Sequence, residues 1–170
     1  MSFERPFDAV VGRLCLMYQP DPVAMLRQLV RQLKPGGIVA FLEFDLRSAA
    51  SVPESPLFAR AMKWANAALV GTGADDRMGL KLDSSFTAAG LPAPCMSMDA
   101  CIGGGPNFPG LFLLPEVTRS LLPAIERLGI ATAEEVQIES LDSRMRAEIA
   151  ELNAVTILPP LIGAWTKSSS

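Results

Sequence analysis

The feature that most constrains the fold of this chain is the order of patterns in its first 45 residues. An apolar run begins at residues 7–11 without polar alternation, which is typical of a parallel strand buried on both faces. Asp21 is placed as an N-cap before Pro22, the expected first residue of a helix. Pro, Gly and Gly at 35–37 predict a sharp reversal, and residues 38–44 are typical of a second buried strand. This order predicts a right-handed βαβ unit.

The same residues resemble the second half of a class I S-adenosylmethionine-dependent methyltransferase. The phrases FDAVVGRLCLMY from Phe7, LKPGG from Leu33 and IVAFLEFD from Ile38 follow the order of the family's fourth strand, turn and fifth strand. The PGG turn alone is a weak signal, but the whole order over about forty residues is a strong one. The resemblance implies an α/β fold: an incomplete doubly wound, Rossmann-like sheet with parallel strands, an antiparallel last strand, and extra helices before that strand.

The resemblance also implies a cofactor site that this sequence carries only in part. Such enzymes hold S-adenosylmethionine with a Gly-rich turn after the first strand and an acidic residue at the end of the second. In this chain the fourth-strand phrase already begins at Phe7, and the glycines at 103–105 open no helix. We therefore expect the C-terminal part of the fold, from the fourth strand on, with the N-terminal cofactor-binding half absent.

Charge and composition exclude several classes of partner. The net charge is −3 and the sequence pI is about 5.0, so the chain has no basic footprint for nucleic acid. Hydrophobic residues make up 49% of the chain, yet no uninterrupted apolar run approaches the roughly 18 residues of a membrane helix. The first six residues carry no apolar signal-peptide core. We expect no nucleic-acid partner, no membrane partner and a cytoplasmic location.

The chain contains no histidine, which narrows its chemistry. A Ser-His-Asp hydrolase, a histidine metal site and an imidazole base are excluded. Cys15, Cys95 and Cys101 form no close metal-type pair, so we expect buried reduced thiols and no metal site. Methyl transfer tolerates the lack of an imidazole, because placing the nucleophile in line with an activated sulfonium can supply most of the catalysis.

The resemblance places the amino-acid part of the cofactor near the end of the fourth strand. Gly12, Arg13 and Leu14 lie at that position, so they are the candidate cofactor-binding residues. Arg13 would meet the cofactor carboxylate with its forked guanidinium. The alternatives for Arg13 are a surface arginine or an arginine paired with Glu43.

The next strand ends in two acidic residues, Glu43 and Asp45, which could orient or deprotonate a substrate. Glu43 is the candidate catalytic residue and Asp45 a candidate for the substrate pocket. Two carboxylates at a strand end could equally be solvated or cap local backbone donors. Met17, Tyr18 and Trp64 are further candidates to line the substrate pocket, and core packing is the alternative for each of them.

The later part of the chain is interpreted as belonging to one domain, residues 1–170, with a helical insertion at about 111–153. Ser55 before Pro56 opens one helix, and Thr132 with Glu135 predicts a capping box for another. The resemblance implies that the inserted helices would form a substrate lid, and an oligomer contact is the alternative. Pro159-Pro160 interrupts the last strand, which predicts a bulge or an edge position. The expected ranges are helices at 55–70, 81–89, 116–128 and 132–153, and strands at 95–102 and at 155–158 continued by 161–166.

We interpret the chain as part of an S-adenosylmethionine-dependent methyltransferase that acts on a small molecule and is inactive alone. The alternative is a non-catalytic, truncated methyltransferase-like subunit, or a ligand-binding or association module. The expected partners are a small-molecule methyl acceptor and a second copy of the chain. A homodimer would form through the exposed edge of the strand at residues 7–16, or through an exchanged element, because a long apolar edge is a template for pairing.

Overall fold

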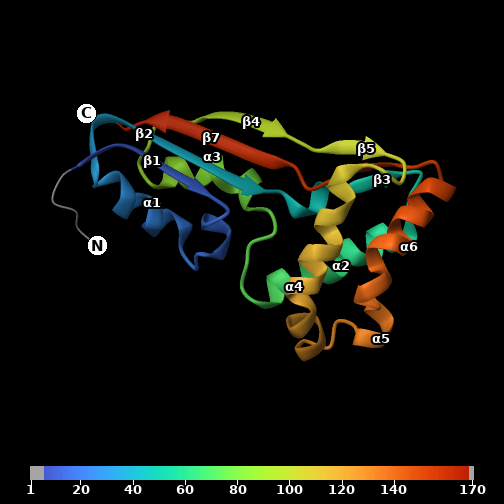
Figure 1. Ribbon diagram of the computed structural model, residues 1–170. Coiled ribbons are helices and arrows are strands. Elements are labelled where there is room, and N and C mark those ends of the chain that lie inside the picture. Colours follow the sequence, from blue (N-terminus) through green and yellow to red (C-terminus); the bar gives the residue numbers. More distant parts are fainter. Residues whose placement is uncertain (1–5, 169–170) are drawn as a thin grey trace. The chain divides into compact units, whose positions relative to one another are not determined.

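The computed structural model describes residues 6–168, which divide into two compact units (Figure 1). Unit 1 comprises the described parts of Met1–Asp45, Asp75–Asp99 and Leu161–Ser170, and unit 2 comprises Leu46–Ala74 and Ala100–Pro160. Each unit has its own sheet and its own buried side chains. The expectation of one domain over residues 1–170 stays a prediction.

The sheet of unit 1 has four strands in the order β1-β2-β7-β4. Strands β1 and β2 are parallel and joined through helix α1, while β7 is antiparallel to both β2 and β4. This arrangement confirms the predicted fold class, with parallel strands and an antiparallel last strand. The bounds are β1 Phe7–Arg13, α1 Pro22–Val30, β2 Leu33–Phe44, α3 Met78–Ala88, β4 Cys95–Asp99 and β7 Leu161–Lys167.

One face of this sheet is covered by helices. Helices α1 and α3 pack against each other and against β2. Val39 and Phe41 of β2 point to this face and are buried, and the ring of Phe41 meets that of Phe86 edge-on, with centroids 6.3 Å apart. Because side chains alternate along a strand, the residues between them point to the opposite face. This alternation sets which residues of unit 1 form its core.

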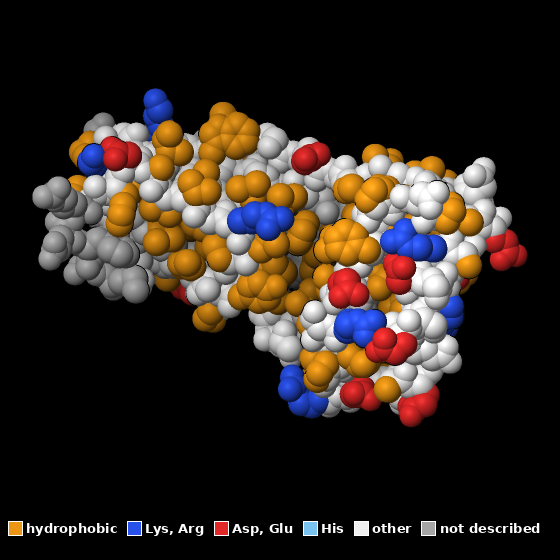
Figure 2. All heavy atoms as spheres, in the orientation of Figure 1, with side chains coloured by type: hydrophobic (Ala, Val, Ile, Leu, Met, Phe, Trp, Pro, Cys, Tyr) orange, Lys and Arg blue, Asp and Glu red, His pale blue; other side chains and the backbone are white. Residues whose placement is uncertain are grey.

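The opposite face of the sheet carries apolar side chains that are largely exposed. Val11 of β1, Ile38 of β2 and Trp165 of β7 are 70%, 44% and 43% exposed. Figure 2 shows hydrophobic side chains spread over the strands of unit 1. The expectation that residues 7–11 are buried on both faces was therefore wrong. The physical reason is that helices α1 and α3 pack on the other face of the sheet, and among residues 6–168 β1 also has a neighbouring strand on one side only.

The predicted helix of unit 1 begins where expected. Asp21 accepts a hydrogen bond from the Ala24 N–H at 2.8 Å, and Pro22 is the first helical residue. The reversal comes earlier than predicted, because α1 ends at Val30 and the chain turns at residues 31–32. Gly36 has a φ of +73° as its sequence suggests, but it lies within β2, whose pairing with β1 is irregular between Phe7 and Ala9.

Unit 2 combines a small sheet with packed helices. Its three strands have the order β3-β6-β5, and helices α2, α4 and α6 surround a buried apolar cluster. The bounds are β3 Ala50–Val52, α2 Pro56–Gly71, β5 Ile102–Gly104, α4 Leu113–Arg127, α5 Ala133–Val136, α6 Ile138–Glu151 and β6 Val155–Ile157, with short 3-10 turns at Leu46–Ser48 and Pro109–Phe112. Within residues 6–168, no helix is long and apolar enough to span a membrane.

The structure corrects two predicted strands. Residues 95–102 do not form one strand, since β4 belongs to the sheet of unit 1 and β5 to that of unit 2. The last strand is divided in the same way, because Pro159 and Pro160 separate β6 from β7. Prolines cannot donate to a strand ladder. Here they end one strand before the next begins in a different sheet, and they make no bulge within a single strand.

Helix caps in unit 2 follow the sequence signals. The Ser55 hydroxyl accepts from the Phe58 N–H at 3.1 Å, and the predicted capping box of Thr132 and Glu135 is present. The capping box begins only the four-residue helix α5. Gln137 adopts a φ of +48°, which ends this helix before α6 begins. The long helix predicted from Thr132 is therefore two helices.

Candidate functional site

The candidate site lies in unit 1, where β1 ends. After Gly12 and Arg13, Leu14 takes a positive φ of +53° and donates its N–H to the Leu42 carbonyl at 2.9 Å. The chain then enters a 3-10 turn, Leu16–Tyr18. A positive φ is strained for a branched residue, so this turn requires support from its surroundings.

Glu43 supplies that support from the neighbouring strand. Its Oε1 accepts from the N–H groups of Cys15 at 2.9 Å and Leu16 at 2.7 Å, and its Oε2 accepts from the Met17 N–H at 3.3 Å. The Glu43 side chain is fully buried. Of the roles that the sequence left open, the geometry corresponds to a cap on local backbone donors. The carboxylate fixes the shape of the turn that follows Arg13, and its catalytic role stays a prediction.

Cys15 lies against this carboxylate, and its chemistry is affected by it. Burial raises the pKa of the Cys15 thiol above its ordinary value, and the negative charge of Glu43 raises it further. Cys95 and Cys101 are exposed, in contrast to the expectation that all three thiols are buried. The reason is that Cys95 lies on the edge strand β4 and Cys101 between two edge strands.

We expect thiol labelling to show two fast-reacting cysteines and one slow-reacting cysteine. At pH 8 Cys95 and Cys101 react first, while Cys15 lags because its raised pKa keeps it protonated and its sulfur is partly buried. Stopped-flow reaction with a disulfide reagent, followed by peptide mapping, measures this. Glu43→Gln should speed the reaction of Cys15, since the repelling charge is gone. Equal rates for all three thiols would contradict this description of the turn.

Arg13 occupies the other face of the strand end. It pairs with Leu42 across the sheet and is exposed. Glu43 points to the helix-covered face, so the alternation of side chains keeps it apart from Arg13. Among the described residues, Arg13 forms no ion pair. Of the two alternatives to a cofactor contact, the structure therefore agrees with a surface arginine and disagrees with a Glu43 partner.

A second group of charged residues braces the turn. The Asp75 N–H donates to the Met17 carbonyl at 2.7 Å, and its carboxylate binds Lys81 Nζ at 2.5 Å. Asp45 is 1% exposed, with Arg77 Nε 3.5 Å from its Oδ1. Asp76 is buried and Asp75 is ion-paired, so neither carboxylate is simply solvated. No local pattern marks these contacts, which depend on the return of the chain to β1.

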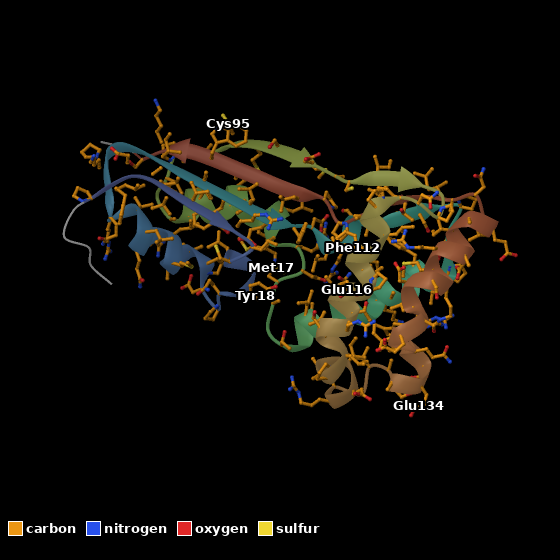
Figure 3. All side chains as sticks on the ribbon, in the orientation of Figure 1. Met17, Tyr18, Cys95, Phe112, Glu116 and Glu134 are labelled. Atoms are coloured by element: carbon orange, nitrogen blue, oxygen red, sulfur yellow. The ribbon has the colours of Figure 1, made fainter. Side chains whose placement is uncertain are left out.

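The remaining predicted pocket residues fall in different surroundings. Met17 is 2% exposed and Tyr18 is 53% exposed, although both lie in the turn after β1 (Figure 3). Trp64 belongs to α2 and is buried in the apolar cluster of unit 2. The structure thus brings together Gly12, Arg13, Leu14, Met17, Tyr18, Glu43 and Asp45 at one end of the β1–β2 pair, and Trp64 is not part of this group within unit 1.

The carboxylates of this turn already bind groups of the protein itself, so their role here is to hold the backbone of the turn in place. Glu43 binds three backbone donors, and Asp45 lies beside Arg77. Across residues 6–168, no group of three or more His, Cys, Asp or Glu side chains could hold a metal ion. What the strand end offers to a ligand is the exposed Arg13 and the side chain of Tyr18.

Comparisons with known proteins agree with this architecture. The unit 1 sheet, with its parallel pair and antiparallel last strand, defines a Rossmann-like α/β protein. The family model described as a methyltransferase domain matches residues 1–41. A search of curated proteins finds no match. The resemblance stated from the sequence is therefore matched by a methyltransferase-domain model over residues 1–41.

Similar solved structures cover nearly all of this chain. A provisionally assigned methyltransferase from Bacillus halodurans C-125 has a TM-score of 0.55 and 13% identity, over 100% of this chain and 67% of its own. Phosphoethanolamine N-methyltransferase 2 from Haemonchus contortus, solved with phosphomonomethylethanolamine and S-adenosylhomocysteine, has a TM-score of 0.45 and 14% identity, over 96% and 34%. A provisionally assigned sarcosine dimethylglycine methyltransferase from Galdieria sulphuraria has a TM-score of 0.43 and 16% identity, over 97% and 54%. The chain thus spans between a third and two thirds of these structures.

Proposed function

We propose that the chain is part of an S-adenosylmethionine-dependent methyltransferase acting on a small molecule. It supplies the wall of the cofactor site formed by the carboxyl end of β1. The observation that carries this proposal is that the segment matched by the methyltransferase-domain model folds as a parallel βαβ unit. The strand end of that unit, where ligands bind in doubly wound sheets, presents an exposed arginine.

The residues at this strand end fit one part of the cofactor. The forked guanidinium of Arg13 suits a carboxylate such as that of the amino-acid end of S-adenosylmethionine. The N–H groups of Cys15, Leu16 and Met17 are occupied by Glu43, so the turn contributes shape and not hydrogen-bond donors. When bound, the cofactor supplies an activated methyl group. The chain's own contribution is to hold one end of the cofactor in place.

We propose that cofactor binding by this chain alone is weak, and that the chain alone is inactive. Within residues 6–168, no strand lies beyond β1 in the unit 1 sheet. A Gly-rich turn that follows a strand and opens a helix is not found in the same residues. The parts of a class I site that approach the ribose and the rest of the nucleoside are therefore not supplied by the described residues.

A small acceptor is favoured over a nucleic acid by charge. The chain has a net charge of −3, and nucleic-acid affinity depends on many cationic contacts to phosphates. Tyr18 is the exposed side chain of the turn, and we assign it to the acceptor side of the site. Methyl transfer to a small nucleophile depends mainly on aligning the nucleophile with the methyl group. This suits a strand end where Glu43 holds the backbone and Asp45 lies beside Arg77, since both carboxylates are already used to fix the structure.

Titration with S-adenosylhomocysteine, followed by amide NMR, tests the proposal. We expect weak binding, with a dissociation constant of about 1 mM or higher, and shift changes confined to residues 12–18. Arg13→Ala should abolish these changes. Arg31→Ala is the matched control, because Arg31 is an exposed arginine of unit 1 that follows α1 at the amino end of β2. Micromolar affinity would contradict weak binding by this chain, and shifts elsewhere would contradict the assigned strand end.

A second candidate function is a non-catalytic association module. The observation that favours it is the long outer edge of β1, together with the exposed apolar side chains on the open face of the sheet. The two candidates differ in the ligand titration. A methyltransferase part shows weak but localised shifts at the end of β1, whereas an association module shows none at any concentration of S-adenosylhomocysteine.

A further inference from the structure

The loop between β5 and α4 is a stiff turn with a glycine at each end. Its sequence at residues 105–110 is Gly-Pro-Asn-Phe-Pro-Gly. The Phe108 N–H donates to the Gly105 carbonyl at 3.3 Å, which closes a turn with Pro106 at its second position. The two prolines restrict the backbone, whereas Gly105 has a φ of +73°, which other residues rarely adopt. Such a segment can move as one piece about its glycine ends.

The ring of Phe108 fixes this turn to the rest of unit 2. It packs against the apolar cluster that α2, α4 and α6 surround. A Cβ on Gly103 would overlap the ring, and a Cβ on Gly110 would lie 2.6 Å from its Cζ and 2.9 Å from Leu158 Cδ1. Leu158 is a buried member of the cluster. The loop therefore covers this end of the cluster, and the close approach of the ring requires both glycines.

Arg146 of α6 holds the turn by hydrogen bonds. Its Nη1 donates to the Pro106 carbonyl at 2.7 Å and to the Phe108 carbonyl at 3.3 Å. Its Nε lies 3.0 and 2.9 Å from the two carboxylate oxygens of Asp142, which keeps the guanidinium in one orientation. Among the described residues, no other side chain hydrogen-bonds to the turn at 105–108. One arginine thus supplies the polar attachment of the whole turn.

We propose that residues 105–109 form a flap that opens about Gly105 and Gly110 and that Arg146 holds closed. In the closed state the Phe108 ring lies against two glycines. In the open state the ring leaves this position, while the turn keeps its own hydrogen bond. Opening uncovers Leu158 and that end of the cluster. The flap therefore controls whether an apolar group from outside can reach the interior of unit 2.

A second arginine of α6 offers an internal comparison. Arg144 Nη2 donates to the carbonyls of Val136 at 2.7 Å and Gln137 at 3.3 Å, at the end of α5. Helix α5 is also held by its capping box and by the fully buried Val136. The flap has one partly buried ring and a turn whose Pro106 and Asn107 are exposed. Local opening occurs where buried contacts are few, so loss of Arg146 frees the flap and loss of Arg144 does not free α5.

Thiol trapping beneath the flap tests the proposal. Leu158→Cys places a thiol at a position that the closed flap covers, and peptide mapping separates it from the three native cysteines. When opening is fast relative to labelling, the labelling rate follows the population of the open flap. Arg146→Met in this background should raise the rate about 10- to 100-fold, because charge-assisted hydrogen bonds to two carbonyls are lost. Arg146→Lys can keep one of them and should give an intermediate rate.

Two controls separate opening of the flap from unfolding of unit 2. Arg144→Met is the matched variant, and it should leave the labelling rate at position 158 unchanged. Ile125→Cys places a thiol in the same cluster but in the last turn of α4, away from the flap at the start of that helix. Its labelling should stay slow in Arg146→Met. An unchanged rate at position 158 in both Arg146 variants, an equal rise with Arg144→Met, or an equal rise at position 125 would each overturn the proposal.

Discussion

Replacing Glu43 with alanine is expected to lower the free energy of unfolding by about 3–5 kcal/mol. The carboxylate accepts from three backbone N–H groups, and Leu16 and Met17 are almost fully buried. Alanine leaves these donors without a partner, and each unsatisfied buried donor costs about 1–3 kcal/mol. Urea denaturation followed by circular dichroism measures the change.

Glu43→Gln separates the structural role of this side chain from a catalytic one. The amide oxygen can keep the bonds from Cys15 and Leu16, but the amide nitrogen then faces the Met17 N–H, so a loss of about 1–2 kcal/mol is expected. The exposed Glu151→Ala is the control and should cost less than about 0.5 kcal/mol. If Glu43→Ala were as mild as this control, Glu43 would not hold the turn. A catalytic Glu43 would instead show in a loss of activity with Gln despite the smaller loss of stability.

The parts of the fold that the sequence predicts well depend on residues close together in the chain. Asp21, Ser55 and Thr132 cap helices as predicted, because a cap depends only on residues within one turn. The parallel pairing of β1 with β2 also follows from local patterns, since an apolar strand, a helix and a second apolar strand in close succession allow few other arrangements.

The parts of the fold that the sequence did not predict depend on pairing between strands that are far apart in the chain. The residues around Cys95–Asp99 and Ile102–Gly104 have one continuous strand pattern, yet they pair in different sheets. Nothing in their composition states which partner each will meet, because strand propensity reflects neighbours more than the strand itself. The exposure of β1 has the same origin: an apolar run shows that a strand suits burial, but the other strands decide whether it is covered.

The candidate site shows the same division. A strand end bearing Gly12 and Arg13 could be predicted from the βαβ pattern, because ligands bind at the carboxyl ends of parallel strands. The task of Glu43 could only be stated as one of several alternatives. Its resolution required the positive φ of Leu14, which turns the following N–H groups toward the carboxylate. The contact of Asp75 with Met17 joins residues far apart in sequence and has no local signal.

Gly12→Ala is expected to destabilise the chain by about 1–3 kcal/mol. A Cβ at Gly12 would overlap the ring of Phe41 and would lie 2.8 Å from Cys15 Sγ. Phe41 is 1% exposed and held against Phe86, so its ring has little room to move. Gly12 is thus required by packing one residue before Arg13. Thermal and urea denaturation of the variant measure the loss.

Two further variants show whether the Phe41 ring causes this loss. At Gly163 of β7 a Cβ would meet only Ser97 Oγ at 3.4 Å and Leu42 Cγ at 3.9 Å, so Gly163→Ala should be neutral or stabilise by up to about 1 kcal/mol. Combining Gly12→Ala with Phe41→Leu should cost less than the sum of the two single changes, by about 0.5–3 kcal/mol, because the smaller side chain gives the new methyl group space. Strict additivity would mean that Gly12 is needed for its backbone and not for the ring. A double variant that loses less stability than the sum of the two single variants would instead show that Gly12 is required because the Phe41 ring lies against it.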